Sequence, residues 1–125
     1  MSIKFVVCKH CGNIAGMVKD SGVPMMCCGQ PMEELIPNTQ DAAQEKHVPS
    51  VKIDEKKVDI QVGDILHPMD EDHYIEWIYL KTDKGGQRRT LKPGDEPKAL
   101  FGAREGKPEA VYAYGNLHGL WKVDL

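Results

Sequence analysis

Four cysteines within the first 28 residues are the feature that most constrains the fold of this chain. Cys8 and Cys11 are separated by two residues, and after fifteen intervening residues Cys27 and Cys28 stand side by side. A two-residue gap lets the backbone turn so that both sulfurs point at one ion. Because two pairs of thiolates complete one tetrahedral site, the sequence predicts a small module built around a metal ion.

The adjacent pair leaves the identity of that metal open. Zinc ribbons usually repeat the two-residue gap, whereas the adjacent Cys27 and Cys28 must splay their side chains to bind one ion. Spacing alone does not separate zinc from iron in a site of four sulfurs, and a disulfide between Cys27 and Cys28 is a further alternative. His10 lies between the first two cysteines and is expected to face solvent.

The chain of 125 residues is long enough for this module and one domain of modest size. The residues after Pro37 are polar and read as a linker. We therefore expect one domain over residues 1–37 and a second over residues 38–125.

The second part of the chain has the pattern of an antiparallel β-sandwich. Residues 57–62 alternate polar and apolar side chains, and residues 74–80 are rich in β-branched and aromatic types. Turn signals recur roughly every eight to twelve residues without a convincing amphipathic helix, which predicts about seven strands. Ile75, Trp77 and Tyr79 are expected to share one face of a strand and to pack in the core.

Charge and hydropathy exclude several classes of partner. The formal net charge is −3, so the chain has no overall basic field and nucleic acid is not an expected partner. No apolar run is long enough to span a bilayer, and residues 1–7 lack the features of a signal peptide. We expect a cytoplasmic protein that does not bind membranes, and in that reducing compartment clustered cysteines indicate metal ligands rather than disulfides.

Four of the five histidines are candidates for a second metal site: His47, His67, His73 and His118. Each of them taken alone could be an ordinary loop residue. His67 and His73 stand at the two ends of an acidic loop, from which both could reach one ion. Four neutral imidazoles suit a divalent first-row metal such as iron, zinc or copper.

Several short motifs together resemble the desulfoferrodoxin family, the two-iron superoxide reductases. They are Glu45-Lys46-His47-Val48-Pro49, His67-Pro68-Met69, His73-Tyr74-Ile75-Glu76-Trp77-Ile78 and Asn116-Leu117-His118-Gly119-Leu120-Trp121. The start with four cysteines resembles desulforedoxin, a small rubredoxin-like iron protein. The resemblance covers nearly the whole chain and implies a desulforedoxin-like domain followed by an immunoglobulin-like β-sandwich.

The resemblance also implies a function and its cofactors. It implies one-electron reduction of superoxide to hydrogen peroxide, two iron ions per chain, a homodimer and a rubredoxin-like electron donor. Zinc or calcium could replace iron in a crystal. Carried over position by position, the first iron would be held by Cys8, Cys11, Cys27 and Cys28, and the second by His47, His67, His73 and His118.

The family's axial cysteine does not carry over to this chain. The family motif Cys-Asn-x-His stands here as Gly115-Asn116-Leu117-His118, and no cysteine follows Cys28. In the family this thiolate is held to donate electron density to iron and to help the peroxide leave, an axial-ligand effect of the kind known for haem thiolates. Gly115 at this altered axial position therefore predicts impaired or altered chemistry.

The resemblance gives roles to two charged residues as well. Lys46 would attract superoxide and help protonate the bound product, and Glu45 would ligate the oxidised iron after the product leaves. The plainer alternative is a solvated Glu–Lys pair on a loop. Two alternatives for the whole protein stay open: an electron-transfer protein that uses only the four-cysteine iron, and a zinc-bound structural module.

Overall fold

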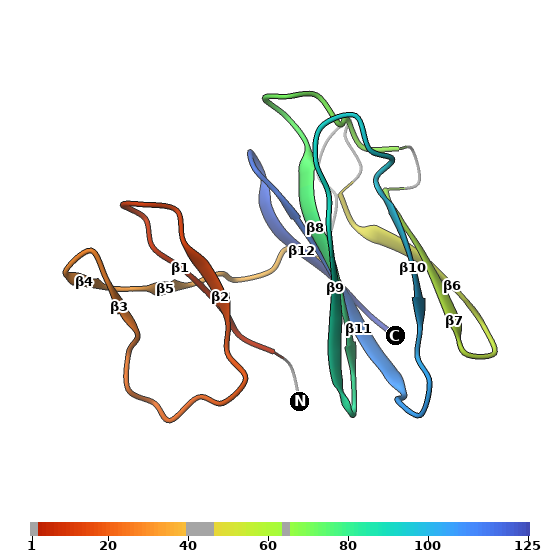
Figure 1. The fold of residues 1–125 in the computed structure, drawn as a ribbon, viewed down its shortest axis with the longest axis horizontal. Coiled ribbons are helices and arrows are strands. Elements are labelled where there is room, and N and C mark those ends of the chain that lie inside the picture. The colour runs from red at the N-terminus through yellow and green to blue at the C-terminus, as the bar shows by residue number, and fades with distance from the viewer. Residues whose placement is uncertain (1–2, 40–46, 64–65) are drawn as a thin grey trace. The chain divides into compact units, whose positions relative to one another are not determined.

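The computed structural model describes residues 3–39, 47–63 and 66–125 (Figure 1), so Glu45 and Lys46 lie outside the described residues. The chain divides into two compact units, with the boundary between Ile36 and Pro37. The described residues contain no helix with the length and apolarity that a membrane crossing requires.

The first unit consists of short strands around the cysteines. Its strands are β1 (Phe5–Val7), β2 (Ile14–Gly16), β3 (Met26–Cys27), β4 (Gln30–Pro31) and β5 (Glu33–Glu34). The central strand β1 pairs antiparallel with β2 on one side and β5 on the other, and β3 pairs with β4 as a small hairpin. All three residues of β1 are buried, as its apolar composition predicts.

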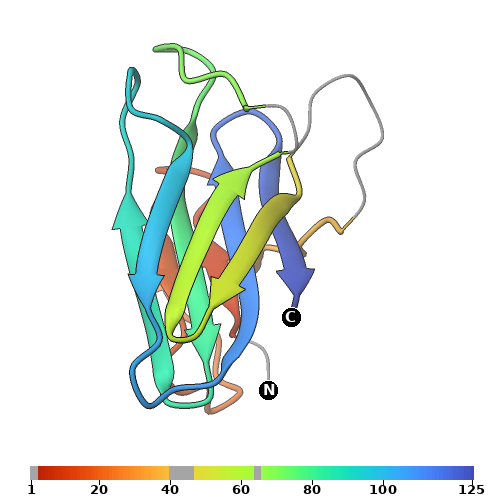
Figure 2. The ribbon, with the colours of Figure 1, turned by 90° about the vertical axis from the view of Figure 1, so that its right-hand side faces the viewer.

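The second unit is an antiparallel β-sandwich (Figure 2). Its strands are β6 (Pro49–Asp54), β7 (Lys57–Val62), β8 (Ile75–Thr82), β9 (Gly85–Thr90), β10 (Lys98–Gly102), β11 (Pro108–Gly115) and β12 (Gly119–Asp124). One sheet has the order β10-β7-β6 and the other the order β12-β11-β8-β9. These seven strands confirm the predicted fold class, a mainly β chain with an antiparallel sandwich.

The core lies between these two sheets. The alternation of residues 57–62 puts Val58, Ile60 and Val62 inside with no exposed surface. Ile78 and Leu80 of β8 and Val111 of β11 belong to the same buried cluster. Burial of each such side chain contributes roughly 1.5–3 kcal/mol relative to exposure, which makes the sandwich a rigid support for the loops at its ends.

The prediction that Ile75, Trp77 and Tyr79 share one core face was wrong for two of the three. Ile75 is fully buried, but Trp77 and Tyr79 are only partly buried. The register between β8 and β11 shifts at this point, because Gly115 pairs with Ile75 whereas Tyr114 pairs with Trp77. The extra residue of this bulge, Glu76, reverses the alternation, so Ile78 and Leu80 continue the core face.

Trp77 and Tyr79 instead pack against aromatic rings of β11 on the other face of the sheet. Trp77 stacks on Tyr114 with ring centroids 5.5 Å apart, and Tyr79 meets Tyr112 edge to face at 6.2 Å. Cross-strand aromatic pairs of this kind stabilise a sheet by a few tenths of a kcal/mol up to about 1 kcal/mol.

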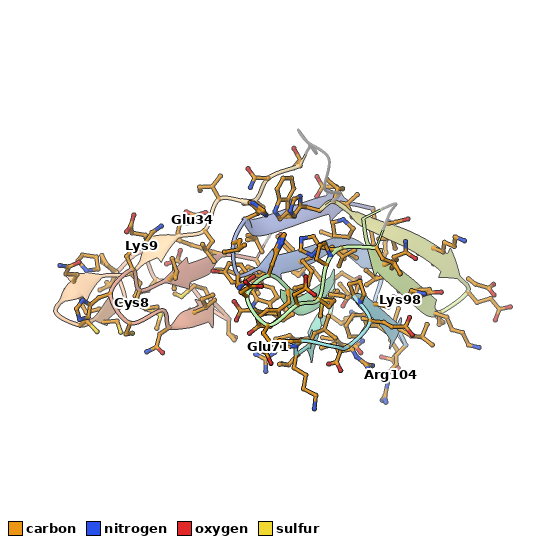
Figure 3. The ribbon with its side chains drawn as sticks, turned by 90° about the horizontal axis from the view of Figure 1, so that it is seen from above. Cys8, Lys9, Glu34, Glu71, Lys98 and Arg104 are labelled. Carbon is orange, nitrogen blue, oxygen red and sulfur yellow. The ribbon has the colours of Figure 1, made fainter. Side chains whose placement is uncertain are left out.

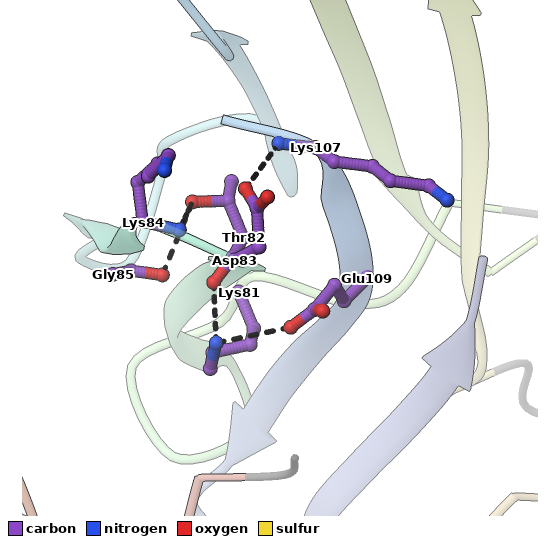
Figure 4. Close-up of polar contacts among 7 residues, drawn as sticks. All are labelled: Lys81, Thr82, Asp83, Lys84, Gly85, Lys107 and Glu109. Carbon is purple, nitrogen blue, oxygen red and sulfur yellow. Dashed lines mark hydrogen bonds and ion pairs between the residues drawn. The ribbon is translucent and has the colours of Figure 1, made fainter. Parts of the chain in front are cut away.

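Polar contacts hold the end of the sandwich at which β8 finishes and β11 begins (Figure 4). The backbone N–H of Lys107 donates to the Asp83 carboxylate at 2.6 Å, and the Lys81 ammonium lies 3.0 Å from the Glu109 carboxylate. The Lys81 ammonium also donates to the Thr82 carbonyl. Because the register puts Ile75 and Gly115 at the other end of the same strand pair, this network lies at the end away from the histidines.

Candidate metal centres

The four cysteines of the first unit form one group. Their sulfurs all lie within 4.8 Å of one another (Figure 3 labels Cys8). The Cys11 and Cys27 sulfurs are 3.6 Å apart, and those of Cys27 and Cys28 are 4.0 Å apart. A tetrahedral site with metal–sulfur distances of about 2.3 Å needs neighbouring sulfurs about 3.8 Å apart, so the group fits one ion. All four cysteines are free.

Local backbone geometry shapes this group. The Gly12 N–H donates to the Cys8 carbonyl at 2.8 Å, which closes the first turn, and Gly12 has the positive φ of 85° that such a turn favours. Cys28 also has a positive φ, 53°. This left-handed backbone at Cys28 separates the directions of the two adjacent side chains and lets both sulfurs join the same group.

The thiols of this group differ in acidity. Hydrogen bonding from the backbone N–H of Cys11 lowers the pKa of the Cys8 thiol to about 6. Hydrogen bonding with the Cys11 side chain raises the pKa of Cys27, and it raises the pKa of Cys28 to about 12. Because a metal binds thiolates, metal binding at neutral pH displaces protons from Cys27 and Cys28, and affinity rises with pH.

The four candidate histidines of the second unit form a closed ring of side chains. Successive ring centroids around it are 4.9 Å apart for His47 and His67, 4.9 Å for His67 and His73, 5.3 Å for His73 and His118, and 4.8 Å for His118 and His47. One nitrogen from each ring lies within 4.8 Å of the others. Four nitrogens about 2.1 Å from a central ion span about 4.2 Å across, so this group also fits one metal.

Hydrogen bonds and burial indicate which imidazole nitrogens face the centre of the histidine group. Nδ1 of His67 lies 2.8 Å from the Pro68 carbonyl, so Nδ1–H donates there and Nε2 is left for a metal. Nε2 of His47 lies 3.1 Å from Nδ1 of His118. The Nε2 atoms of His67 and His73 are buried. A neutral donor set of this kind suits divalent iron.

Burial of the four rings is uneven. His47 and His67 are buried, His73 is half-buried and His118 is exposed. The group is therefore supported by protein at His47 and His67 and open to solvent at His118.

Strand ends and loops of one end of the sandwich supply the histidines. His47 precedes β6, His67 follows β7, His73 precedes β8, and His118 lies in the turn between β11 and β12. Backbone bonds hold these segments in place: the His67 N–H donates to the Val62 carbonyl at 3.2 Å, and the Asp70 N–H donates to the His73 carbonyl at 2.9 Å.

Gly115 is buried and lies three residues before His118. It pairs with Ile75 on β8 and with Gly119 on β12. A Cβ added to Gly115 would lie 3.4 Å from Cδ1 of Ile75 and 3.7 Å from the Tyr74 carbonyl oxygen, both ordinary contacts, and its φ is not positive. Neither backbone conformation nor crowding requires glycine at this position.

Sequence reasoning missed two residues that support the histidines. Asn116 joins the His73 segment to the His118 turn: its side chain accepts from the Tyr74 N–H at 2.9 Å and donates to the Asp72 carbonyl at 3.0 Å. Trp121 contacts both His47 and His118. Both residues stand in the motif that drew attention to His118, but only the fold reveals their contacts. His10 is exposed and belongs to neither group.

Comparison with known proteins agrees with this arrangement. The sequence model of the family described as desulfoferrodoxin matches residues 39–124. This chain belongs to the desulfoferrodoxin family. Its groups of four cysteines and four histidines are consistent with the two iron sites of a desulfoferrodoxin.

The relatives cover both units. A desulfoferrodoxin homolog from Archaeoglobus fulgidus is 46% identical over 115 residues, which is 92% of this chain and 91% of the relative. The desulfoferrodoxin of Nitratidesulfovibrio vulgaris is 43% identical over 117 residues, 94% of this chain and 92% of the relative. Among solved structures, the superoxide reductase from Treponema pallidum matches with a TM-score of 0.84 at 29% identity, over 98% of both chains.

Proposed function

We propose that this chain is a superoxide reductase of the two-iron type, with reactive iron at the histidine group and a second iron at the cysteine group. The observation that carries the proposal is the convergence of four imidazoles, from four separate segments, in a chain of the desulfoferrodoxin family. The likeness to a solved superoxide reductase over nearly the whole chain supports it.

The proposed reaction adds one electron and two protons to superoxide and yields hydrogen peroxide. Ferrous iron, when bound at the histidine group, would supply that electron. The chain's own contribution is to hold four neutral nitrogens around one point, to support His47 and His67 with packed protein, and to leave the side at exposed His118 open to a small anion.

A product assay tests this function. Superoxide supplied at a known rate should give one hydrogen peroxide per superoxide consumed, with no oxygen released, as long as an electron donor is present. Release of oxygen faster than spontaneous dismutation produces it would identify a dismutase instead. The proposal would be contradicted if protein with iron at both groups consumed superoxide no faster than spontaneous dismutation does.

Gly115 favours a second candidate function. If the axial thiolate is essential, the histidine group would be inert and the protein would act only in electron transfer, through iron held by the cysteine group. A zinc-bound structural module is the remaining alternative. Elemental analysis and colour separate these cases, because ferric iron bound by four sulfurs is strongly coloured and zinc is not.

We propose that Lys46 and Glu45 serve the histidine iron, because they directly precede His47 in the chain. Glu45 would ligate the oxidised iron after the product leaves, which a change of the ferric absorption in Glu45→Ala would support. The ammonium of Lys46 would attract superoxide electrostatically.

Replacement of Lys46 by alanine is expected to slow superoxide reduction about tenfold at low ionic strength. The difference should shrink as added salt screens the charge, since the Debye length is only about 10 Å at 0.1 M. Stopped-flow rates over a salt series measure it. Lys52→Ala, which removes an exposed lysine of β6, is the matched control and should leave the rate unchanged. An unchanged rate in Lys46→Ala at low salt would remove Lys46 from the mechanism.

The two units would have different roles, one in electron transfer and one in superoxide reduction. We propose residues 1–37 as a desulforedoxin-like iron domain and residues 38–125 as the reductase domain. Cys11 and Cys28 are exposed, so iron held there would lie near the surface and accessible to an electron donor. A rubredoxin-like protein is the proposed donor, and its reduced form should bleach the ferric absorption of the first unit.

Because the cysteines must stay reduced, we place the protein in the cytoplasm, which cell fractionation would check.

We also propose a homodimer that forms through the first unit. This unit exposes several apolar side chains, among them Val18, Val23, Met26 and Ile36, with exposed fractions of 61% or more. A unit this small gains stability from a partner as well as from its metal.

Val23→Glu should shift the protein from dimer to monomer in gel filtration at micromolar concentration, because it would bury a charge in the proposed interface. Leu100→Glu is the matched control, since Leu100 is an exposed apolar side chain of β10 in the second unit. A parent protein that already elutes as a monomer would refute the dimer.

A further inference from the structure

Trp121 of β12 contacts two of the four histidines in two different ways. Its ring stacks on the His47 imidazole with centroids 4.5 Å apart and an angle of 13° between the planes. Its indole Nε1–H donates to the His118 carbonyl at 3.1 Å. Trp121 is only 8% exposed, so its indole ring is itself held by packing.

These contacts involve His47 and His118, the two histidines of the group that are farthest apart in the sequence. His47 and His118 are 71 residues apart, yet their facing nitrogens lie 3.1 Å from each other. His118 is exposed, so its ring receives little support from packing. A near-parallel stack limits the tilt of the His47 ring, and the bond to the His118 carbonyl limits movement of the turn that carries the His118 ring.

The backbone of Trp121 is itself held on both sides. Trp121 pairs with Ala113 of β11, and on its other side it forms a bridge with Asn38. The Asn38 N–H donates to the Leu120 carbonyl at 2.9 Å, and the Lys122 N–H donates to the Asn38 carbonyl at 2.9 Å. The indole therefore projects from a fixed point toward the histidines.

We propose that Trp121 is a positioning residue for the metal of the histidine group. It acts through His47 and His118 and does not touch the metal. By fixing the tilt of one ring and the turn that carries another, it keeps both nitrogens aimed at a common point, which slows release of the ion. This inference rests on the proposed function only in requiring a metal at the histidine group.

Iron release from the two-iron protein tests the proposal. Protein with ferrous iron at the histidine group and ferric iron at the cysteine group is mixed with excess ferrous chelator, and release from the histidine group is followed beside the absorption of the ferric four-cysteine iron, which serves as an internal control. Outer partners of metal ligands typically change affinity about 10- to 100-fold. We expect release from Trp121→Leu to be about 10- to 100-fold faster than from the parent. Trp121→Phe, which keeps a stacking ring but loses the N–H donor, should fall between them.

Trp77 provides the matched control, since it is the other of the two tryptophans and stacks on Tyr114. Trp77→Leu should release iron within about twofold of the parent rate. In Trp77→Phe the remaining indole emission comes from Trp121, and iron uptake at the histidine group should quench it because the indole lies against a ligand ring.

Three results would overturn the inference. Release from both Trp121 variants within about twofold of the parent rate would do so, as would an equal acceleration in Trp77→Leu. A parent protein that takes up no iron at the histidine group would overturn it as well. A parent that holds this iron without reducing superoxide would contradict the proposed function and leave the role of Trp121 standing, provided the variants differ in release.

Discussion

Replacement of Gly115 by cysteine is expected to raise the rate of superoxide reduction by about tenfold or more and to add a sulfur-to-iron absorption band. A tenfold faster rate corresponds to an activation free energy lower by about 1.4 kcal/mol. This is a small effect for an anionic ligand bound directly to iron. The structure accommodates the change, because a Cβ at Gly115 makes only ordinary contacts with Ile75 and Tyr74. Stopped-flow kinetics and the ferric spectrum of both proteins provide the measurements.

Gly115→Ala is the matched control, because it adds the same Cβ without a sulfur. It should reproduce the rate and spectrum of the parent. If the parent already reduces superoxide as fast as Gly115→Cys, four histidines suffice and the axial sulfur is optional. If only the cysteine variant reacts and shows the new band, the competence of the parent lies in its four-cysteine iron.

His118→Ala is expected to lose the iron of the histidine group while the four-cysteine iron stays bound. His118 is exposed, so its removal deletes a ligand with little effect on the packed core. Loss of one of four ligands should weaken iron binding by roughly 100-fold, about 2.8 kcal/mol. Iron content per chain after gel filtration should fall from two to one, and superoxide reduction should stop.

His10→Ala controls for the loss of an imidazole. His10 is exposed in the first unit and lies outside the histidine group, so its variant should keep both irons. A His118→Ala protein that retained two irons per chain and the parent rate would remove His118 from the ligand set.

Much of the fold follows from local patterns in the sequence. Val58, Ile60 and Val62 alternate with polar residues, and burial follows that alternation. The glycines of residues 85–86 mark the hairpin between β8 and β9. The bulge at Glu76 could not be predicted in this way, because it depends on how β8 pairs with β11 and not on the composition of β8. That one residue moved Trp77 and Tyr79 to the face opposite the one predicted.

The metal-ligand candidates could be predicted from the sequence, but the residues that support them could not. The cysteines are recognisable by their spacing. The histidines have no such spacing: they were candidates for one metal site before the family resemblance assigned them to iron, and the fold brings them together. The support given by Trp121 and Asn116 is a matter of tertiary contact between segments far apart in the chain, as in the bond from Asn116 to Asp72, 44 residues away. No periodicity encodes such a contact.

The spacing of the two groups along the chain has a consequence for how the protein matures on the ribosome. Cys8 and Cys27 are 19 residues apart, so the thiol group can assemble soon after the first unit emerges. His47 and His118 are separated by 71 residues, and the turn with His118 lies just before the last strand. The histidine group therefore cannot form until the chain has been synthesised as far as His118, so the cysteine group is complete first and can receive its metal earlier.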